Sequence, residues 1–226
     1  MYPYVFKFNI NLKNFIFKND LKIYFEILKM NEINIEPSVD LIVGPMFSGK
    51  STELLRRLVL YKEIFTPKNV LYINCNIDDR SNKNFSTHNS LIKNSELDFL
   101  SKKVDINHLS EILNLTENIK VIGIDEAQMF TDLYTNVMKL VEEKGIKVIL
   151  SGLNSDCYRN DFGELYKFFS KCDTITKLNP FCKECKDSEV IKPAIFSKRV
   201  QTENSDQIVI GGSDVYIPVC RKCYLK

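Results

Sequence analysis

One segment of the chain restricts the possible folds more than any other, a turn with two glycines followed by a lysine and a serine. Residues 44–51 read Gly-Pro-Met-Phe-Ser-Gly-Lys-Ser and match the pattern G-x-x-x-x-G-K-[ST] in full. Glycines in this pattern let the backbone curl, so that successive N–H groups point at a phosphate beside the positive end of a helix. The lysine then reaches the β- and γ-phosphates and the final serine holds Mg²⁺. An apolar run at residues 41–43 predicts a buried strand before the turn, and residues 50–65 predict a helix after it. This context favours a phosphate-binding loop over the alternative, a glycine turn that binds nothing.

Short strands and helices are predicted to alternate along the rest of the body. Apolar runs predict further strands at residues 70–73, 121–124 and 147–150, and helical periodicity predicts helices at residues 109–115 and 134–144. Polar residues 74–95 predict a long loop. Such alternation is typical of an α/β protein with a mostly parallel sheet flanked by helices. Together with the glycine turn, it predicts a P-loop NTPase-like fold.

Two acidic residues, Asp125 and Glu126, follow directly after the apolar run at residues 121–124. In P-loop folds an acidic residue at this position faces the nucleotide and contacts Mg²⁺, directly or through water. The adjacent carboxylate can accept the proton of an acceptor hydroxyl as the new P–O bond forms. An acidic N-cap of the following helix is the alternative. In combination with the P-loop, the pair favours phosphoryl transfer from a Mg²⁺-bound triphosphate.

Four of the seven cysteines form two C-x-x-C pairs, Cys182 with Cys185 and Cys220 with Cys223. Two thiolates at this spacing chelate one ion from a tight turn, and two such turns complete a tetrahedral shell. The odd number of cysteines argues against a secreted disulfide framework and for a reducing compartment. A structural Zn²⁺ with a closed shell is therefore favoured over the alternatives, four free thiols or a pair of disulfides.

Composition limits the partners. The 226 residues carry a net charge of +2, without the basic excess that a nucleic-acid-binding surface needs. The apolar runs are too short to span a bilayer, and lysines interrupt those that precede the first predicted strand, so we expect neither a membrane anchor nor a signal peptide. We expect a cytoplasmic protein in three parts, an N-terminal extension of unknown role (1–37), a P-loop α/β domain (38–178) and a zinc-binding subdomain with a substrate-covering loop (179–226).

Taken together, these motifs resemble the type II thymidine kinase family, the zinc-containing group found in many cells and large DNA viruses. The resemblance covers residues 40–224 and is carried by residues 44–54, 124–128 and 219–224, with a Gly-Gly pair before Tyr216. It implies transfer of the γ-phosphate of ATP to the 5′-hydroxyl of thymidine, typically also of deoxyuridine, for DNA precursor salvage. It further implies Mg²⁺ as cofactor and a homotetramer.

The resemblance also implies roles for individual residues. Glu126 resembles the catalytic base on the 5′-hydroxyl, and Arg80 the family arginine near that hydroxyl and the transferring phosphate. Asp78 joins Ser51 and Asp125 around Mg²⁺. The residues implied to bind ATP are Gly44, Pro45, Met46, Phe47, Ser48, Gly49, Lys50, Ser51 and Thr52. Those implied to bind the nucleoside are Met46, Gln128, Met129, Leu153, Phe162, Ser197, Gly211, Gly212 and Tyr216.

Two positions of the nucleoside pocket depart from the family pattern. Cys157 lies where a phenylalanine is common, and Met129 also replaces an aromatic residue. These differences predict a softer and roomier pocket wall. They bear on base selectivity and not on the class of reaction.

Two other functions fit parts of the sequence. A P-loop ATPase or GTPase switch would act on protein partners, but residues 82–85, Asn-Lys-Asn-Phe, lack the acid of the N-K-x-D guanine-binding motif. A zinc-dependent nucleic-acid-binding module conflicts with the near-neutral charge. Both rank below a deoxynucleoside kinase.

Overall fold

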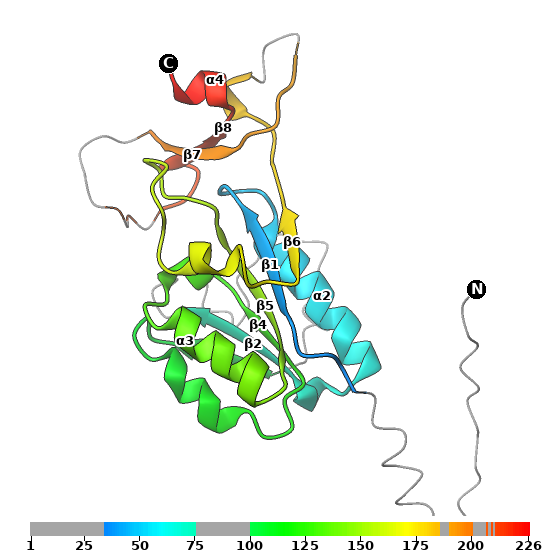
Figure 1. Cartoon of the computed structure of the whole chain (residues 1–226). Helices are drawn as coiled ribbons and strands as arrows, with labels where there is room; N and C mark the ends of the chain where they lie inside the picture. The colour runs from blue at the N-terminus through cyan, green and yellow to red at the C-terminus, as the bar shows by residue number, and fades with distance from the viewer. Residues whose placement is uncertain (1–33, 76–99, 186–189, 201–206, 208, 210) are drawn as a thin grey trace, which may run out of the picture. The chain divides into compact units, whose positions relative to one another are not determined.

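The computed structural model describes residues 34–75, 100–185, 190–200, 207, 209 and 211–226 (Figure 1). The chain divides into two units, Met1–Asn34 and Ile35–Lys226, and the architecture below is that of the second. The loop predicted at residues 74–95 lies outside the described residues except for Asn74 and Cys75, which belong to a strand.

A sheet of six parallel strands forms the body of the described chain. In spatial order these strands are β3 (Leu100–Val104), β2 (Val70–Cys75), β4 (Val121–Ile124), β5 (Lys147–Leu153), β1 (Val39–Gly44) and β6 (Thr174–Lys177). Every neighbouring pair is parallel. The carboxyl ends of β1, β4 and β5 therefore meet at one edge of the sheet, where α/β proteins bind their ligands.

Helices and helical turns connect the strands. The longest is α2 (Lys50–Ile64), and α3 (Leu133–Met138) continues as a π-helical turn, η6 (Lys139–Glu143). The 3₁₀ helices of the body are η2 (Pro67–Asn69), η4 (Leu109–Leu115), η5 (Ala127–Met129) and η7 (Leu165–Phe168). No helix among the described residues is long and apolar enough to cross a bilayer.

The two faces of the sheet bury two separate apolar clusters. On β1, Leu41 and Val43 belong to the cluster that also contains residues of α3, whereas Ile42 packs with α2 on the other side. Figure 1 shows α2 and α3 on either side of the sheet. Continuous apolar strands and helical layers on both faces confirm the predicted α/β class with a mostly parallel sheet.

Gly123 in β4 lets α2 approach the sheet closely. A Cβ atom at this position would lie 2.7 Å from a methyl group of Leu58 and 2.9 Å from one of Leu54. Both leucines are fully buried, as the predicted apolar face of residues 50–65 requires. Helix α2, which follows the glycine turn, therefore packs directly over β4, the strand that ends just before Asp125.

The region after residue 178 contains little regular structure. An antiparallel hairpin of β7 (Phe196–Arg199) and β8 (Tyr216–Val219) lies between two helical turns, η8 (Lys183–Cys185) and α4 (Arg221–Tyr224). The small buried cluster of this region consists mainly of cysteines. Its core therefore consists of four thiol side chains with only two aliphatic residues, Ala194 and Val219.

Candidate active site

The glycine turn connects the end of β1 to the start of α2. Phe47 (φ 63°) and Gly49 (φ 84°) both have left-handed backbone conformations. A Cβ atom on Gly44 would lie 2.2 Å from the carbonyl oxygen of Leu178, so only glycine fits there. Because these conformations turn the backbone inward, the segment adopts the curled geometry that the sequence pattern predicts.

Two buried polar side chains of this turn, Ser48 and Lys50, could bind a phosphate. The hydroxyl oxygen of Ser48 is buried and has no hydrogen-bond partner among the described residues. The ammonium group of Lys50 is buried and donates to the carbonyl oxygen of Pro45 at 3.0 Å. Burial lowers the pKa of Lys50, while the carboxylates of Glu126 and Asp125 raise it. A negatively charged ligand in the turn would satisfy both groups, so the turn fits a phosphate.

Asp125 lies at the carboxyl end of β4 and is almost completely buried. Its carboxylate accepts hydrogen bonds from the hydroxyls of Tyr72 (3.1 Å) and Ser151 (2.7 Å), and also bonds to the Ser51 side chain. Burial raises the pKa of Asp125 to about 6, and the neighbouring Glu126 carboxylate adds to the rise. The structure thus brings Ser51 and Asp125 together, and these are oxygen ligands of the kind that Mg²⁺ binds.

Glu126 follows Asp125 and is held by its neighbour Gln128. The Gln128 amide nitrogen donates to the Glu126 carboxylate at 2.7 Å, and its amide oxygen accepts from the backbone N–H of Leu153 at 3.0 Å. Glu126 has a left-handed backbone (φ 47°), which costs a non-glycine residue about 1–2 kcal/mol. Gly152 leaves room for the glutamine, since a Cβ atom there would lie 2.6 Å from its amide oxygen. Strain of this kind is retained where a side chain must point in one direction.

A second group of predicted residues meets at the junction of the turn and the β7–β8 hairpin. The side chains of Met46, Cys157, Val215 and Tyr216 pack together, and Val209 lies against them. The Ser197 hydroxyl accepts a hydrogen bond from the backbone N–H of Met46 at 2.9 Å.

The glycines of the hairpin loop lie beside this group. Gly211 is so close to Val215 that a Cβ atom would meet its side chain at 2.3 Å, and the Gly212 carbonyl accepts from the N–H groups of Val215 and Tyr216. The structure therefore brings Met46, Ser197, Gly211, Gly212 and Tyr216 together.

The remaining predicted residues lie elsewhere or outside the described chain. Met129 packs against the main apolar cluster of the body, and Phe162 is half-buried beside Gly163. Thr52 belongs to the first turn of α2. Asp78 and Arg80 lie outside the described residues.

Several residues of the site were not predicted from the sequence. Tyr72 and Ser151 hold Asp125, but they come from strands far apart in the chain. Arg199 donates to the Tyr216 hydroxyl at 3.0 Å and carries no motif of its own. Asp156 accepts from the backbone N–H groups two and four residues later, a pattern that an aspartate in a polar loop can signal.

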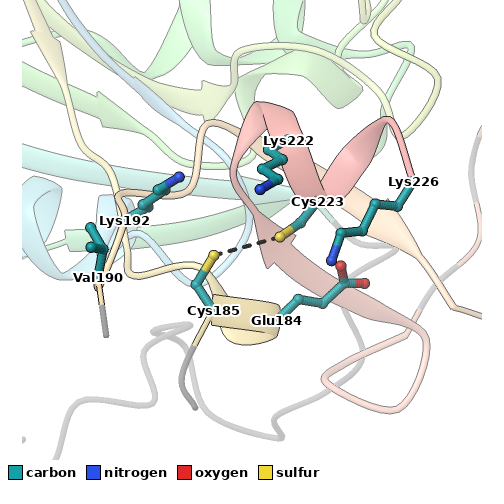
Figure 2. A pocket seen from close by; sticks show the side chains of 7 residues that line it. All are labelled: Glu184, Cys185, Val190, Lys192, Lys222, Cys223 and Lys226. Atoms are coloured by element: carbon teal, nitrogen blue, oxygen red, sulfur yellow. Dashed lines mark hydrogen bonds between the residues drawn. The ribbon is translucent and has the colours of Figure 1, made fainter. Parts of the chain in front are cut away.

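The four cysteines of the two C-x-x-C pairs lie together in space. Their sulfur atoms are all within 4.8 Å of one another, and Cys185 Sγ is 3.8 Å from Cys220 Sγ. Figure 2 shows Cys185 and Cys223, whose sulfur atoms are 3.5 Å apart. Zn–S bonds of about 2.3 Å in a tetrahedral shell place the sulfurs roughly 3.8 Å apart. The donor set therefore fits a tetrahedral metal ion such as Zn²⁺.

The pKa values of the cysteine thiols also fit a metal site. A backbone hydrogen bond from Cys223 lowers the pKa of Cys220 to about 7, whereas hydrogen bonding to Cys185 raises that of Cys223 to about 12. Four thiols this close cannot all ionise unless a cation compensates their charge. Lys192, Lys222 and Lys226 line the pocket beside Cys185 and Cys223 together with one acid, Glu184 (Figure 2). The surplus of positive charge would offset the excess negative charge of four thiolates around a divalent ion.

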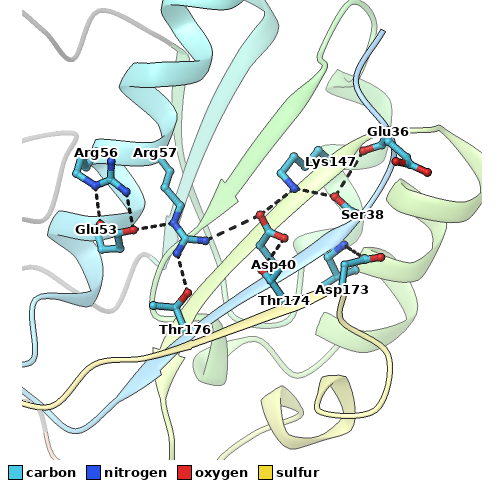
Figure 3. A network of polar contacts seen from close by, with 11 residues as sticks. Glu36, Ser38, Asp40, Glu53, Arg56, Arg57, Lys147, Asp173, Thr174 and Thr176 are labelled. Carbon is cyan, nitrogen blue, oxygen red and sulfur yellow. Dashed lines mark hydrogen bonds and ion pairs between the residues drawn. The ribbon is translucent and has the colours of Figure 1, made fainter. Parts of the chain in front are cut away.

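A network of charged and polar side chains joins α2, the helix after the glycine turn, to the sheet (Figure 3). Asp40 of β1 pairs with Lys147 of β5 at 2.8 Å and with Arg57 of α2 at 3.9 Å. Arg57 also pairs with Glu53 at 2.8 Å and donates to the Thr176 hydroxyl of β6 at 2.8 Å. Because buried ion pairs fix geometry more than they add stability, the network holds α2 in place against three strands.

The fold and the site define an α/β P-loop protein with a four-cysteine cluster and an Asp-Glu pair at the phosphate-binding edge of its sheet. A sequence model of the thymidine kinase family matches residues 37–224. The chain belongs to the thymidine kinase family, a family of nucleoside kinases.

Individual relatives agree with this assignment. The chain is 40% identical over 191 residues to the thymidine kinase of Amsacta moorei entomopoxvirus, covering 83% of this chain and 97% of the relative. It is 36% identical to thymidine kinase a of Arabidopsis thaliana, covering 83% of this chain and 75% of the relative. It is 33% identical to the thymidine kinase of Bacteroides thetaiotaomicron, covering 83% of this chain and 87% of the relative. These matches favour a kinase over a P-loop switch.

Proposed function

We propose that this protein transfers the γ-phosphate of ATP to the 5′-hydroxyl of thymidine, and of deoxyuridine, for DNA precursor salvage in the cytoplasm. The observation that carries the proposal is the position of Glu126. Its carboxylate is oriented by Gln128 and directly follows Asp125, which bonds to Ser51 of the glycine turn. A proton acceptor therefore lies beside the phosphate site, as transfer to a hydroxyl requires.

The donor side of the reaction belongs to the glycine turn. Residues 44–52 would hold the triphosphate through their backbone N–H groups, of which Pro45 has none, and the Lys50 ammonium would bind its β- and γ-phosphates. Ser51 and Asp125 would hold Mg²⁺, joined by Asp78. The ion neutralises charge that develops on the phosphoryl oxygens. The ligand would also relieve the burial cost of Lys50, whose charge is stabilised among the described residues by the carboxylates of Glu126 and Asp125.

Glu126 would accept the proton of the 5′-hydroxyl as the oxygen attacks phosphorus. Gln128 prevents this carboxylate from rotating away, since it bonds Glu126 and the Leu153 backbone at once. We assign Arg80 to the transferring phosphate on the resemblance to the family.

The nucleoside would lie against the group around Tyr216. Thymine has flat apolar faces, which suit side chains such as Met46 and Tyr216, while polar groups fix its edge. The resemblance to the family adds Met129, Leu153 and Phe162 to the residues that bind the nucleoside, and these are not part of the cluster around Tyr216. Backbone groups of Gly211 and Gly212 and the Ser197 hydroxyl would supply those polar contacts. Burial of Cys157 in this wall in place of an aromatic ring leaves space for larger substituents on the base.

The cysteine cluster would hold a structural Zn²⁺. Its four sulfurs leave no open position on the ion, so it would stabilise the C-terminal subdomain (179–226) and not act on the substrate. We further propose that the P-loop domain spans residues 38–178, that residues 1–37 form a separate extension, and that the enzyme is a homotetramer.

Activity of the purified protein tests the proposal directly. With ATP, Mg²⁺ and thymidine it should form thymidine monophosphate, and a panel of the four deoxynucleosides should rank thymidine first. Lys50→Ala should lower the turnover at least about 100-fold, because it removes a charge that stabilises the transition state. Glu126→Gln, which keeps the shape and loses the base, should retain ATP binding and lose turnover. A wild-type protein that hydrolyses ATP at a rate independent of any nucleoside would contradict the proposal.

A further inference from the structure

We propose that Tyr224 is a positioning residue that couples the four-cysteine cluster to the wall of the nucleoside pocket. Metal binding and nucleoside binding then strengthen each other. The inference rests on the proposed function, since it takes the group around Tyr216 to be the nucleoside pocket. It assigns to Tyr224 a role that neither the phosphate site nor the metal site requires.

The backbone of Tyr224 is fixed by the cysteine cluster. The residue directly follows Cys223 in α4, and its N–H donates to the carbonyl oxygen of Cys220 at 2.9 Å. Its ring packs against the small buried cluster that contains all four cysteines. A metal ion that draws Cys220 and Cys223 together therefore sets the position of the tyrosine.

The hydroxyl of Tyr224 reaches a distant loop of the body. It donates to the carbonyl oxygen of Cys157 at 2.7 Å. The Arg159 guanidinium lies over the Tyr224 ring, 4.7 Å from its centroid, and the Phe196 ring lies 5.1 Å from the same ring. Arg159 has a left-handed backbone (φ 72°), so this loop is held in a conformation that a non-glycine residue does not prefer. Hydrogen bond and stacking together fix the loop to α4.

The same loop supplies part of the pocket wall. The Cys157 side chain is buried against Val215 and Tyr216, and Met46 of the glycine turn packs on the same cluster. Asp156 shapes the loop internally by accepting from the N–H groups of Tyr158 and Asn160, but these bonds do not connect it to the cysteine cluster. Strand β8 joins the two sites along the chain, since it begins at the pocket residue Tyr216 and leads into Cys220. Tyr224 adds a second link that the body's loop can respond to, through its hydrogen bond to the Cys157 carbonyl.

Thermodynamic linkage provides the test. If the two sites are coupled, thymidine raises the affinity for Zn²⁺ by the same factor by which Zn²⁺ raises the affinity for thymidine. Zinc affinity of the full chain would be measured by equilibrium competition with a chromogenic chelator, with and without saturating thymidine. Thymidine affinity would be measured by calorimetry on the zinc-loaded protein.

Tyr224→Phe is the decisive variant, because it keeps the aromatic ring and removes only the hydroxyl. In the wild type we expect thymidine to raise the zinc affinity about fivefold, which corresponds to roughly 1 kcal/mol, the usual worth of one hydrogen bond. In Tyr224→Phe we expect this increase to fall below twofold and thymidine to bind about fivefold more weakly. Zinc affinity without thymidine and affinity for ATP should stay unchanged. Tyr166→Phe, a change at an exposed tyrosine of η7, is the matched control and should behave as the wild type.

A second variant tests whether a loss of coupling in Tyr224→Phe comes from the link between α4 and the loop and not from a local structural defect. Arg159→Ala removes the stacking partner and leaves the hydroxyl of Tyr224 in place. It should weaken the coupling without changing the zinc affinity of the nucleoside-free protein.

Three results would overturn the inference. The first is a wild type that binds thymidine and zinc independently, which would leave the proposed function intact. The second is a Tyr224→Phe protein with unchanged coupling, or one that loses zinc affinity even without thymidine, since the hydroxyl would then be structural. The third is a wild type that does not bind thymidine at all, which would overturn the proposed function together with the inference.

Discussion

The parallel-sheet body and the C-terminal region of this protein are stabilised in different ways. The body buries aliphatic side chains on both faces of the sheet, with Leu41 and Val43 on one side and Ile42 on the other. In the C-terminal region the buried cluster consists of the four cysteines with Ala194 and Val219. The hydrophobic effect accounts for the first, whereas the second has only a small apolar cluster, and the proposed metal would supply the rest of its stability.

The two regions also differ in how their sites affect the free energy of unfolding. In the body, the phosphate site buries the charges of Lys50 and Asp125, which lowers stability until a ligand arrives. In the C-terminal region, a metal bound by the four cysteines would itself supply folding energy. The empty phosphate site thus destabilises the body, whereas a metal in the cysteine site would stabilise the C-terminal region. Substitutions or ligand removal in each region test this contrast.

Metal removal should have the largest effect and should be confined to one region. Apparent binding free energies of structural zinc sites are about 10–16 kcal/mol, so a strong chelator should unfold the segments around Cys182 and Cys220. Hydrogen exchange followed by mass spectrometry should show lost protection in β7, β8 and α4, with β1, β4 and β5 unchanged. Cys220→Ser should reproduce the effect. Cys172→Ser, outside the cluster, is its control. Simultaneous loss of protection throughout the sheet would show that the two regions are not independently stabilised.

A cavity in the sheet should destabilise the body and leave the C-terminal region unaffected. Leu150 of β5 is fully buried in the main apolar cluster, so Leu150→Ala should lower the free energy of unfolding of the body by about 3–4 kcal/mol. Denaturant titration would measure the loss, and the zinc affinity should stay at the wild-type value. Ile175→Ala, at an exposed position of the edge strand β6, should cost much less. A large fall in zinc affinity in Leu150→Ala would remove the distinction between the regions.

The pH dependence of stability should show how much stability is lost when the buried Asp125 ionises. Asp125 has a pKa of about 6 in the folded protein, above the unfolded value, so its contribution to stability is complete below pH ~4. This contribution is lost as the pH rises from about 4 to about 6, and it amounts to at most about 3 kcal/mol. Asp125→Asn cannot ionise and should gain stability relative to the wild type over this range. Urea titrations at several pH values, without nucleotide or Mg²⁺, would measure the difference. Asp161→Asn, at an exposed position, is the control, and a wild type and Asp125→Asn with parallel pH profiles would contradict the assignment.

Those parts of the fold that could be predicted depend on local signals. The buried strand at residues 121–124 is β4 with the same bounds, and the helix predicted at residues 50–65 is α2 to within one residue. Both have a clear apolar pattern of the right period. The helix predicted at residues 134–144 begins one residue earlier and changes to a π-helical turn at Lys139, a change of hydrogen bonding that apolar periodicity does not reveal.

The edge strands and the polar contacts could not be predicted. Strand β3 reads Leu-Ser-Lys-Lys-Val and β6 reads Thr-Ile-Thr-Lys, and neither has a continuous apolar run, because an edge strand need not be apolar on both sides. Asp40 and Lys147 meet only after the sheet has assembled, so no local pattern connects them. The motif residues of the candidate site could be proposed from the sequence because each motif is contiguous, whereas the contacts of Arg199 and Tyr224 join separate segments.

The ion-pair network around Arg57 affects the entropy of nucleotide binding. It fastens α2 to β1 and β6, so the two ends of the glycine turn are held at a constant separation before any ligand arrives. A loop restrained at both ends has few conformations to lose when a triphosphate binds. Most of the interaction energy of the N–H groups and Lys50 therefore remains available for affinity, and none of the residues that secure this advantage needs to touch the nucleotide.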